Sequence, residues 1–354
     1  MTERKKTVCG PDFEFNLFAR GKSAAELKLK GSPRLLLGRV TLENKFSETG
    51  SLEKKLRRHE SADLFSIGLE SLNILPFGCE YAIARDFEVS DGFAEYANDI
   101  SALHFGRVGN LELEPLTFTG DPQHVSFLLP GDDKWTEADL EEEKELYSGS
   151  RPLLMLSVRY ADDSCVEYAV GTDLWRHCAA EQIPGATGEF TLTFDGENLI
   201  YERKMLIYDP DTEPEKRPWR FKNLLAWRTG ETSSILETAE YFAAKGCQMA
   251  PVNRREVRKK VRSAKKDMIL QEASPCICSE SAHVERPGRK GFAHFDLAEY
   301  VSFRLWANKQ LAKSGFHLVI DPAETSIFKN TAAMRNLRNI PGTLEPCMEE
   351  EEDV

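Results

Sequence analysis

The sequence predicts a mainly β protein, in which a large antiparallel β-sandwich is followed by a smaller α+β domain. Two observations carry this prediction. Short segments rich in β-branched and aromatic residues follow one another from the N-terminus, separated by Gly, Asp, Asn and Pro, which is typical of antiparallel sheets. After a proline-rich segment near residue 210, the apolar residues recur with helical spacing instead.

Eleven segments have the composition of strands, and turn residues between them predict hairpins. In Glu189–Phe194 the large apolar side chains alternate, so they share one face of a sheet. Asp195-Gly196 and Asp162-Asp163 are expected to form hairpin turns. The eleven segments are Asp12–Phe18, Glu26–Lys30, Arg34–Phe46, Leu64–Leu75, Glu80–Val89, Leu111–Phe118, His124–Leu129, Leu153–Tyr160, Cys165–Val170, Glu189–Phe194 and Leu199–Tyr208.

One of these strands carries charged residues on both faces. Asp86 and Glu88 share a face, and two carboxylates so placed can reach the separations that glycoside hydrolysis uses. An acidic outer face explains them more simply, and solvent exposure is therefore the expectation. Arg85 is expected on the opposite face, beside Tyr81 and Phe87.

Charge divides the chain into two compositional units. The formal net charge is −12, and residues 51–200 carry 29 acidic against 11 basic residues, whereas residues 201–350 carry 25 basic against 20 acidic. The acidic run Thr136–Leu146 is expected to be an exposed loop or short helix. The acidic unit would repel phosphate backbones, so only the second unit could contact nucleic acid.

The predicted domains are the sandwich at 1–208, a proline-rich connector at 209–218, an α+β domain at 219–345 and a disordered acidic tail at 346–354.

Three helices are expected in the α+β domain. The first covers Ser234–Lys245 and ends at Gly246, a natural left-handed cap. The others begin at Asn253 and Asp296, each with a glutamate three residues later as in a capping box. A strand is expected at Phe316–Ile320.

The densest polar stretch spans residues 276–296 and is the expected location of a functional site. It ends at a helix N-terminus, where backbone N–H groups favour an anion, and it has the character of a loop held by rigid flanking elements. Its polar side chains are Cys276, Cys278, His283, Glu285, Arg286, Arg289, Lys290, His294 and Asp296.

His283, Glu285 and His294 are the candidate catalytic residues, because imidazole and carboxylate groups suit proton transfer. Asp296 has a competing role as a helix cap.

The candidate substrate-binding residues are Arg286 and Arg289, whose guanidinium groups suit oxyanions, together with Trp175 and Trp219 as surfaces on which a sugar ring could stack. A solvated basic loop and buried tryptophan packing are the plainer interpretations.

A zinc site would use Cys276, Cys278, His283 and His294, but a Cys-x-Cys pair and widely separated histidines fit the usual ligand spacing poorly. We therefore assign no metal ligand. Nucleotide-binding glycine motifs, a Gly-x-Ser-x-Gly elbow and a His-Glu-x-x-His helix are absent from the sequence, and no cofactor is expected.

These features favour a carbohydrate-recognising or carbohydrate-processing protein, with its site in a groove between the domains around residues 276–296 and a saccharide as ligand. The alternative is a non-enzymatic interaction protein whose basic helix 254–266, with eight Lys/Arg in thirteen positions, binds nucleic acid or an acidic protein partner. Because the chain is acidic and carries no recognised nucleic-acid motif, nucleic acid is the less favoured partner.

A cytoplasmic, membrane-free location is expected. No segment approaches the ~18 to 20 apolar residues of a membrane span, and no apolar segment follows the charged N-terminus. The eight cysteines are scattered along a long chain, which is typical of reduced thiols.

Overall fold

The structure is a computed structural model. It describes residues 5–18, 21–44, 47–48, 50–61, 64–75, 79–102, 110–149, 151–172, 186–207, 219–230, 233–249, 277–279, 296–312, 316–318 and 344–346.

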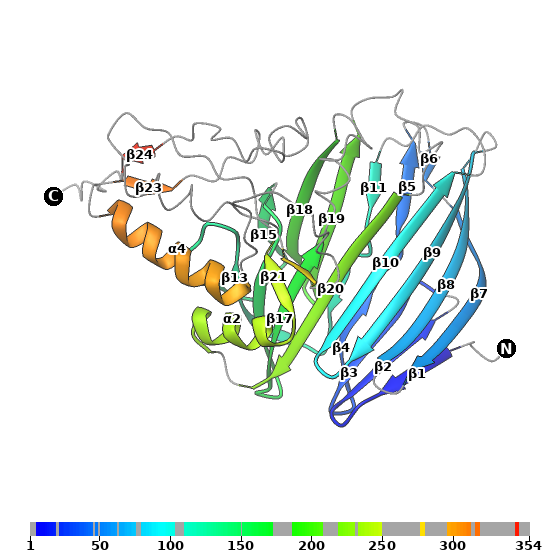
Figure 1. Ribbon diagram of the computed structural model, residues 1–354, viewed down its shortest axis with the longest axis horizontal. Coiled ribbons are helices and arrows are strands. Elements are labelled where there is room, and N and C mark those ends of the chain that lie inside the picture. The colour runs from blue at the N-terminus through cyan, green and yellow to red at the C-terminus, as the bar shows by residue number, and fades with distance from the viewer. Residues whose placement is uncertain are drawn as a thin grey trace, which may run out of the picture.

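Two large antiparallel sheets face each other, so the prediction of an antiparallel β-sandwich is confirmed (Figure 1). The nine-stranded sheet consists, in order, of β14 (Thr136–Asp139), β13 (Pro122–Leu128), β16 (Met155–Tyr160), β17 (Cys165–Thr172), β20 (Trp219–Thr229), β10 (Phe93–Ala102), β9 (Cys79–Ser90), β8 (Leu64–Leu75) and β7 (Gly50–Ser61).

The eleven-stranded sheet is built around β19. Its main path is β1 (Lys5–Cys9), β2 (Phe13–Phe18), β3 (Ala25–Leu29), β4 (Ser32–Leu37), β12 (Leu116–Phe118), β19 (Leu199–Ile207), β11 (Asn110–Glu112), β5 (Thr41–Asn44) and β6 (Ser47–Glu48). On the other side of β19 lies β18 (Ala186–Phe194), which in turn pairs with β15 (Lys144–Gly149).

The core between the sheets comes from the predicted alternation of side chains. Phe190, Leu192 and Phe194 are all buried, as expected from their shared face. An aromatic contact joins the two sheets, because the ring of Phe87 on β9 lies 5.7 Å from that of Phe15 on β2. Within the nine-stranded sheet, the ring of Phe87 lies 5.2 Å from that of Tyr96 on the neighbouring strand.

Both predicted hairpins are confirmed. Asp163 (φ 61°) lies in the turn between β16 and β17, and Gly196 (φ 91°) lies in the turn between β18 and β19. A positive φ strains most side chains, and Gly or Asp tolerates it best.

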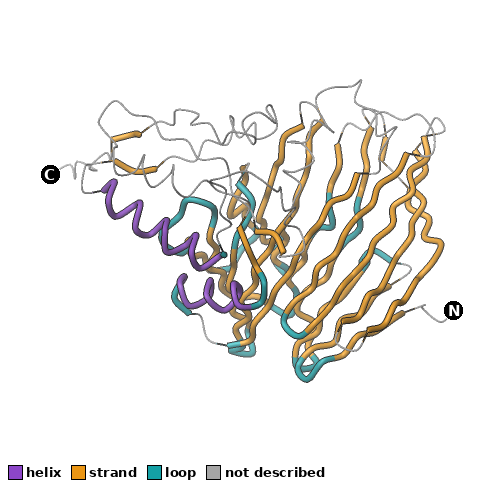
Figure 2. The backbone as a smooth tube through the Cα atoms, viewed as in Figure 1, coloured by secondary structure: helices purple, strands orange, loops and turns teal. Residues whose placement is uncertain are grey.

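Two helices, α2 (Ile235–Ala244) and α4 (Leu297–Ala312), lie side by side next to the nine-stranded sheet (Figure 2). A second apolar core forms there, where Leu224 and Ala226 of β20 pack with residues of both helices. Neither helix in the described ranges is long and apolar enough to cross a membrane. Short strand pairs accompany these helices: β21 (Cys247–Met249) with β22 (Ile277–Ser279), and β23 (Phe316–Leu318) with β24 (Leu344–Pro346).

Two predicted helix ends are confirmed, at Gly246 and at Asp296. Gly246 follows α2 with a φ of 94°. Ser234 and Glu237 form a reciprocal capping box at the start of α2, which was not predicted from the sequence. At α4 the backbone N–H of Glu299 donates to the carboxylate of Asp296 (2.6 Å), which confirms the role of Asp296 as a cap. The helix expected from Asn253 lies outside the described residues.

The prediction of a loop or short helix for Thr136–Leu146 was wrong, because this run contains β14 and the start of β15. β14 is an edge strand, and three of its four residues are exposed. An edge strand gains its stability from backbone pairing with one neighbour, so it needs no apolar alternation, and acidic residues are tolerated there.

The described part of the chain does not test the predicted division into domains. The connector 209–218 and residues 347–354 lie outside the described residues. Residues 219–229, placed by the sequence at the start of the second domain, form β20, which pairs with β17 and β10 of the sandwich.

Candidate functional site

Six polar side chains, each at most 2% exposed, are buried between the two sheets, where apolar groups would be expected. We call them the interior polar cluster. They come from β9, β10 and β20 of one sheet, from β19 of the other, and from the link between β11 and β12. The members of the cluster are Arg85, Tyr96, Asn98, Glu114, Arg203 and Asn223.

Strand alternation brings most of these side chains inward. Arg85 takes the same side of β9 as the buried Phe87, while Asp86 and Glu88 are exposed, as the sequence predicted. On β20, Asn223 occupies the inward position between Phe221 and Leu225. Arg203 follows the buried Tyr201 by two residues on β19, and Asn98 follows the buried Tyr96 by two residues on β10. Both side chains therefore point inward as well.

Glu114 reaches the interior through an irregularity in the sheet. β11 and β12 both pair with β19, through Glu112 opposite Lys204 and Leu116 opposite Tyr201. Residues 113–115 therefore face only residues 202–203, which is the arrangement of a β-bulge. Pro115, with no N–H to donate, follows Glu114 at this point. Such bulges re-aim side chains, and here the carboxylate enters the core.

Hydrogen bonds tie the cluster together across the two sheets. Arg203 donates through Nη1 to Asn223 Oδ1 (3.1 Å), and through Nη2 to Tyr96 Oη (3.0 Å) and to the backbone oxygen of Glu114 (2.7 Å). Asn98 Nδ2 donates to Glu114 Oε2 (3.1 Å). Arg85 Nε lies 3.2 Å from Glu114 Oε1, as an ion pair without hydrogen-bond alignment.

Several buried polar atoms of the cluster still lack a hydrogen bond among the described residues. The donors without a hydrogen bond are Arg85 Nε and Nη1, Arg203 Nε and Asn223 Nδ2, although Arg85 Nε has its ion pair with Glu114. Two oxygens, Glu114 Oε1 and Asn98 Oδ1, accept no hydrogen bond. Leaving a buried polar group unsatisfied costs roughly 1–3 kcal/mol, so a concentration of such atoms in one place calls for an explanation.

The cluster contains more positive than negative charge. Glu114 is its one carboxylate, against the guanidinium groups of Arg85 and Arg203, and Arg203 Nη2 lies 4.0 Å from Glu114 Oε2. Burial lowers the pKa of Arg85, although Glu114 opposes the shift. The pKa of Arg203 is raised, because Tyr96 and Glu114 outweigh the effect of burial. Burial raises the pKa of Tyr96 to about 12, so its hydroxyl is neutral near pH 7.

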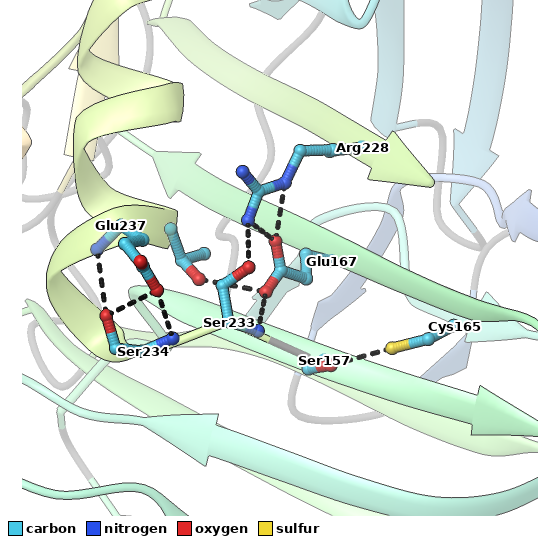
Figure 3. A network of polar contacts seen from close by, with 8 residues as sticks. Ser157, Cys165, Glu167, Arg228, Ser233, Ser234 and Glu237 are labelled. Carbon is cyan, nitrogen blue, oxygen red and sulfur yellow. Dashed lines mark hydrogen bonds and ion pairs between the residues drawn. The ribbon is translucent and has the colours of Figure 1, made fainter. Parts of the chain in front are cut away.

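A second polar network lies on the opposite face of the nine-stranded sheet (Figure 3). Glu167 of β17 accepts hydrogen bonds from Arg228 Nε (2.7 Å) and Nη2, from the backbone N–H of Ser233 (2.9 Å) and from Thr238 Oγ1 (2.9 Å). Both of its oxygens are therefore occupied. This network joins β17 and β20 to the start of α2, and we interpret it as structural.

A serine, a histidine and an aspartate are aligned at the sheet edge. His124 Nδ1 lies 2.7 Å from Asp139 Oδ1, and this contact lowers the pKa of Asp139. Ser126 Oγ lies 3.5 Å from His124 Nε2, beyond the roughly 2.6–3.2 Å of a nucleophile and its base. Ser126 is also only 2% exposed. We therefore interpret these three residues as structural, because the contact of His124 with Asp139 joins β13 to β14.

Most of the site residues predicted from the sequence lie outside the described residues: Trp175, His283, Glu285, Arg286, Arg289 and His294. Trp219 is the first residue of β20, where its backbone pairs with Ile100. In the described ranges, no group of three or more His, Cys, Asp or Glu is placed to hold a metal ion.

The described ends of the 276–296 stretch lie on the helix side of the nine-stranded sheet. Ile277 and Leu297 belong to the apolar core there, and Asp296 forms a bridge with Gln248. The interior polar cluster lies on the other face of that sheet.

Comparison with known proteins gives fold resemblances only. No family model matches the chain, and no curated protein sequence matches it. An α-N-acetylgalactosaminidase from Bifidobacterium bifidum is 9% identical with a TM-score of 0.43; the match covers 75% of this chain and 43% of that enzyme, so the chain spans less than half of its length.

Two further solved structures are similar at the same level. A GalM/aldose epimerase homologue from C. elegans is 10% identical with a TM-score of 0.41, over 65% of this chain and 100% of that one. A glycoside hydrolase family 97 enzyme from Pseudoalteromonas is 8% identical with a TM-score of 0.39, over 63% of this chain and 35% of that one.

Proposed function

We propose that the protein binds a saccharide at the interior polar cluster, as a carbohydrate-recognising or carbohydrate-processing protein. One observation carries the proposal: the cluster holds unpaired donors and unpaired acceptors together in one buried place. Sugar hydroxyl groups both donate and accept hydrogen bonds, so a polyhydroxylated ligand can satisfy both kinds of atom at once.

Other ligand classes satisfy the cluster less well. An inorganic anion would accept from Arg85 and Arg203, but it would leave Asn98 Oδ1 without a hydrogen-bond donor and Glu114 Oε1 with only its ion pair to Arg85. An apolar ligand would leave every one of these atoms unpaired, at roughly 1–3 kcal/mol each. The mixture of donors and acceptors therefore favours a sugar.

The cluster is closed in this structure, since each of its six residues is at most 2% exposed. Because the cluster lies between the two sheets, a saccharide can enter only if the packing around these side chains opens. Binding should therefore include a conformational step, and the observed association rate should saturate as the sugar concentration rises.

Two buried glutamates provide a matched test. Glu114 and Glu167 are both 0% exposed, but Glu114 Oε1 accepts no hydrogen bond and has only its ion pair with Arg85, whereas both oxygens of Glu167 accept hydrogen bonds. A thermal-shift screen of neutral and acidic sugars identifies a ligand for the wild-type protein, because a ligand that binds only the native state raises its melting temperature. E114Q should then weaken the binding of that sugar at least tenfold, while E167Q should retain it.

Circular dichroism at the binding temperature establishes that each variant is folded. Asn98→Ala, which removes a smaller group of the cluster, replaces E114Q if that variant does not fold. Equal affinity in the cluster variants and in E167Q would move the sugar site away from the cluster, and a screen without any sugar-induced shift would reject the proposal.

The 276–296 stretch stays a separate proposed site of sugar processing, distinct from the interior polar cluster, with His283, Glu285 and His294 in proton transfer and Arg286 and Arg289 in binding. His283→Ala should abolish turnover of a substrate sugar and leave the circular dichroism spectrum unchanged. Unchanged turnover would remove His283 from the mechanism. The basic helix 254–266 of the interaction-protein alternative lies outside the described residues, and that alternative stays a prediction.

A further inference from the structure

We infer that the saccharide bound by the interior polar cluster carries an acidic group, as a uronic acid does. This inference rests on the proposed function, and it adds the substrate class. It follows from the charge balance of the cluster and from the ratio of its unpaired donors to its unpaired acceptors.

The charge balance leaves a buried positive excess among the described residues. Arg85 and Arg203 share the single carboxylate of Glu114. Taking an unbalanced charge out of water is costly, and a ligand carboxylate would offset that cost.

The unpaired atoms point to the same ligand class. Apart from Arg85 Nε and Glu114 Oε1, which form an ion pair with each other, three donor atoms and one acceptor atom lack a hydrogen bond among the described residues, and two of those donors belong to arginines. A carboxylate accepts from guanidinium donors without bringing a donor of its own, and such charge-assisted hydrogen bonds are about twice as strong as neutral ones. The hydroxyl groups of the same sugar can donate to Glu114 Oε1 and Asn98 Oδ1.

Matched ligands test the inference on the unaltered protein. The dissociation constants of D-glucuronate, its isosteric neutral amide and D-glucose are measured by calorimetry, and D-galacturonate, its amide and D-galactose form a second set. In the set whose ring configuration binds, the acid should bind at least tenfold more tightly than its amide. Glucose 6-phosphate and galactose 6-phosphate show whether a phosphate replaces the carboxylate.

A pair of arginine variants locates the effect. Arg85→Gln leaves one arginine opposite Glu114, so the preference for acid over amide should fall to within about threefold. Arg34→Gln is the matched control, because Arg34 is also buried but pairs with Asp162 outside the cluster. The control should keep the full preference.

The outcomes separate this inference from the proposed function. Neutral sugars binding as tightly as the acids would overturn the inference and leave the saccharide proposal standing. If the sugar phosphates bind more tightly than the uronates, the acidic group of the ligand is a phosphate and the inference of a carboxylate is wrong. If no sugar of the glucose set, the galactose set or the thermal-shift screen binds, both the acidic-sugar inference and the saccharide proposal are rejected. If Arg85→Gln does not fold, the comparison of acid with amide on the wild-type protein still decides.

Discussion

At the residue scale, Glu114 is the carboxylate that balances the positive charges of Arg85 and Arg203 in the core. Its carboxylate is 0% exposed and lies 3.2 Å from Arg85 and 4.0 Å from Arg203. E114Q leaves two buried guanidinium groups without a counter-charge, and breaking a buried ion pair in this way costs about 3–5 kcal/mol. Urea unfolding followed by tryptophan fluorescence should show a loss of that order.

The control for this prediction is E202Q. Glu202 lies on β19, next to Arg203, and pairs with Lys204 near the surface. A partly exposed ion pair contributes at most about 1 kcal/mol, so E202Q should be nearly as stable as the wild type. Similar losses in the two variants would mean that Glu114 does not balance the buried arginines.

Tyr96 makes a prediction about alkaline pH. Its pKa is about 12 in the folded protein and about 10 in an unfolded chain, so the unfolded state loses the phenolic proton first. The contribution of the protonated Tyr96 hydroxyl to the free energy of unfolding is complete below pH 10. That contribution is lost as the pH rises from 10 towards 12. The Y96F variant has no titrating phenol at this position. It also lacks the oxygen that accepts a hydrogen bond from Arg203, so at pH 8 the variant should be less stable than the wild type by about 1–3 kcal/mol.

The stability gap between Y96F and the wild type should narrow as the pH rises from 10 towards 12. Urea unfolding of both proteins at pH 8 and at several points above pH 10 measures that gap. Tyr160 and Tyr168 also have raised pKa values, but both proteins contain them, so their effect cancels in the comparison. A gap that stays constant would show that the folded protein does not hold Tyr96 protonated.

The sequence carried a signal for part of the interior polar cluster. Alternation along Tyr81–Val89 predicted Arg85 on the face of Phe87, where the structure places it. Arg203 and Asn223 likewise occupy the inward phase of apolar strands. Glu114 could not be found in this way, because a bulge interrupts the alternation, and its partners are distant in sequence.

At the element scale, Glu167 fixes the start of α2 to the sheet. It accepts hydrogen bonds from Arg228, from the N–H of Ser233 and from Thr238. E167Q places an amide beside the guanidinium group and removes charge-assisted hydrogen bonds, each worth about 1.5–3 kcal/mol. Hydrogen exchange should then be faster in the amides of α2, with little change in the strands of the other sheet.

The exposed Glu240 on the same helix provides the control, and E240Q should leave the exchange of α2 unchanged. Faster exchange across both sheets in E167Q would mean that this network stabilises the whole molecule and does not act locally.

Elements with local signals were the ones that the sequence could predict. The cap at Asp296 involves residues three positions apart, the end of α2 is set by Gly246, and the Asp195-Gly196 turn is set by its own two residues. The edge strand β14 has no such local signal, because its conformation depends on backbone pairing with β13, a partner outside its own sequence.

At the scale of the whole molecule, composition and strand pairing divide the chain differently. The charge pattern suggests a boundary near 208, yet β20 pairs through eight residues with β10 and through seven with β17. Without β20, the nine-stranded sheet would separate into β14-β13-β16-β17 and β10-β9-β8-β7. Sequence alone could not place this strand, because the pairing that defines it joins residues more than fifty positions apart.

This pairing predicts that the folding unit extends beyond residue 208. A chain ending at 208 should lack a cooperative urea transition, because the edges of β17 and β10 would have no strand between them. The full chain with a protease site engineered into 209–218 should behave differently after cleavage: its fragments should co-elute in gel filtration and unfold together, since β20 is already in place. If the 1–208 chain instead unfolds with the transition of the intact protein, the compositional boundary is also the folding boundary, and β20 belongs to an independent second domain.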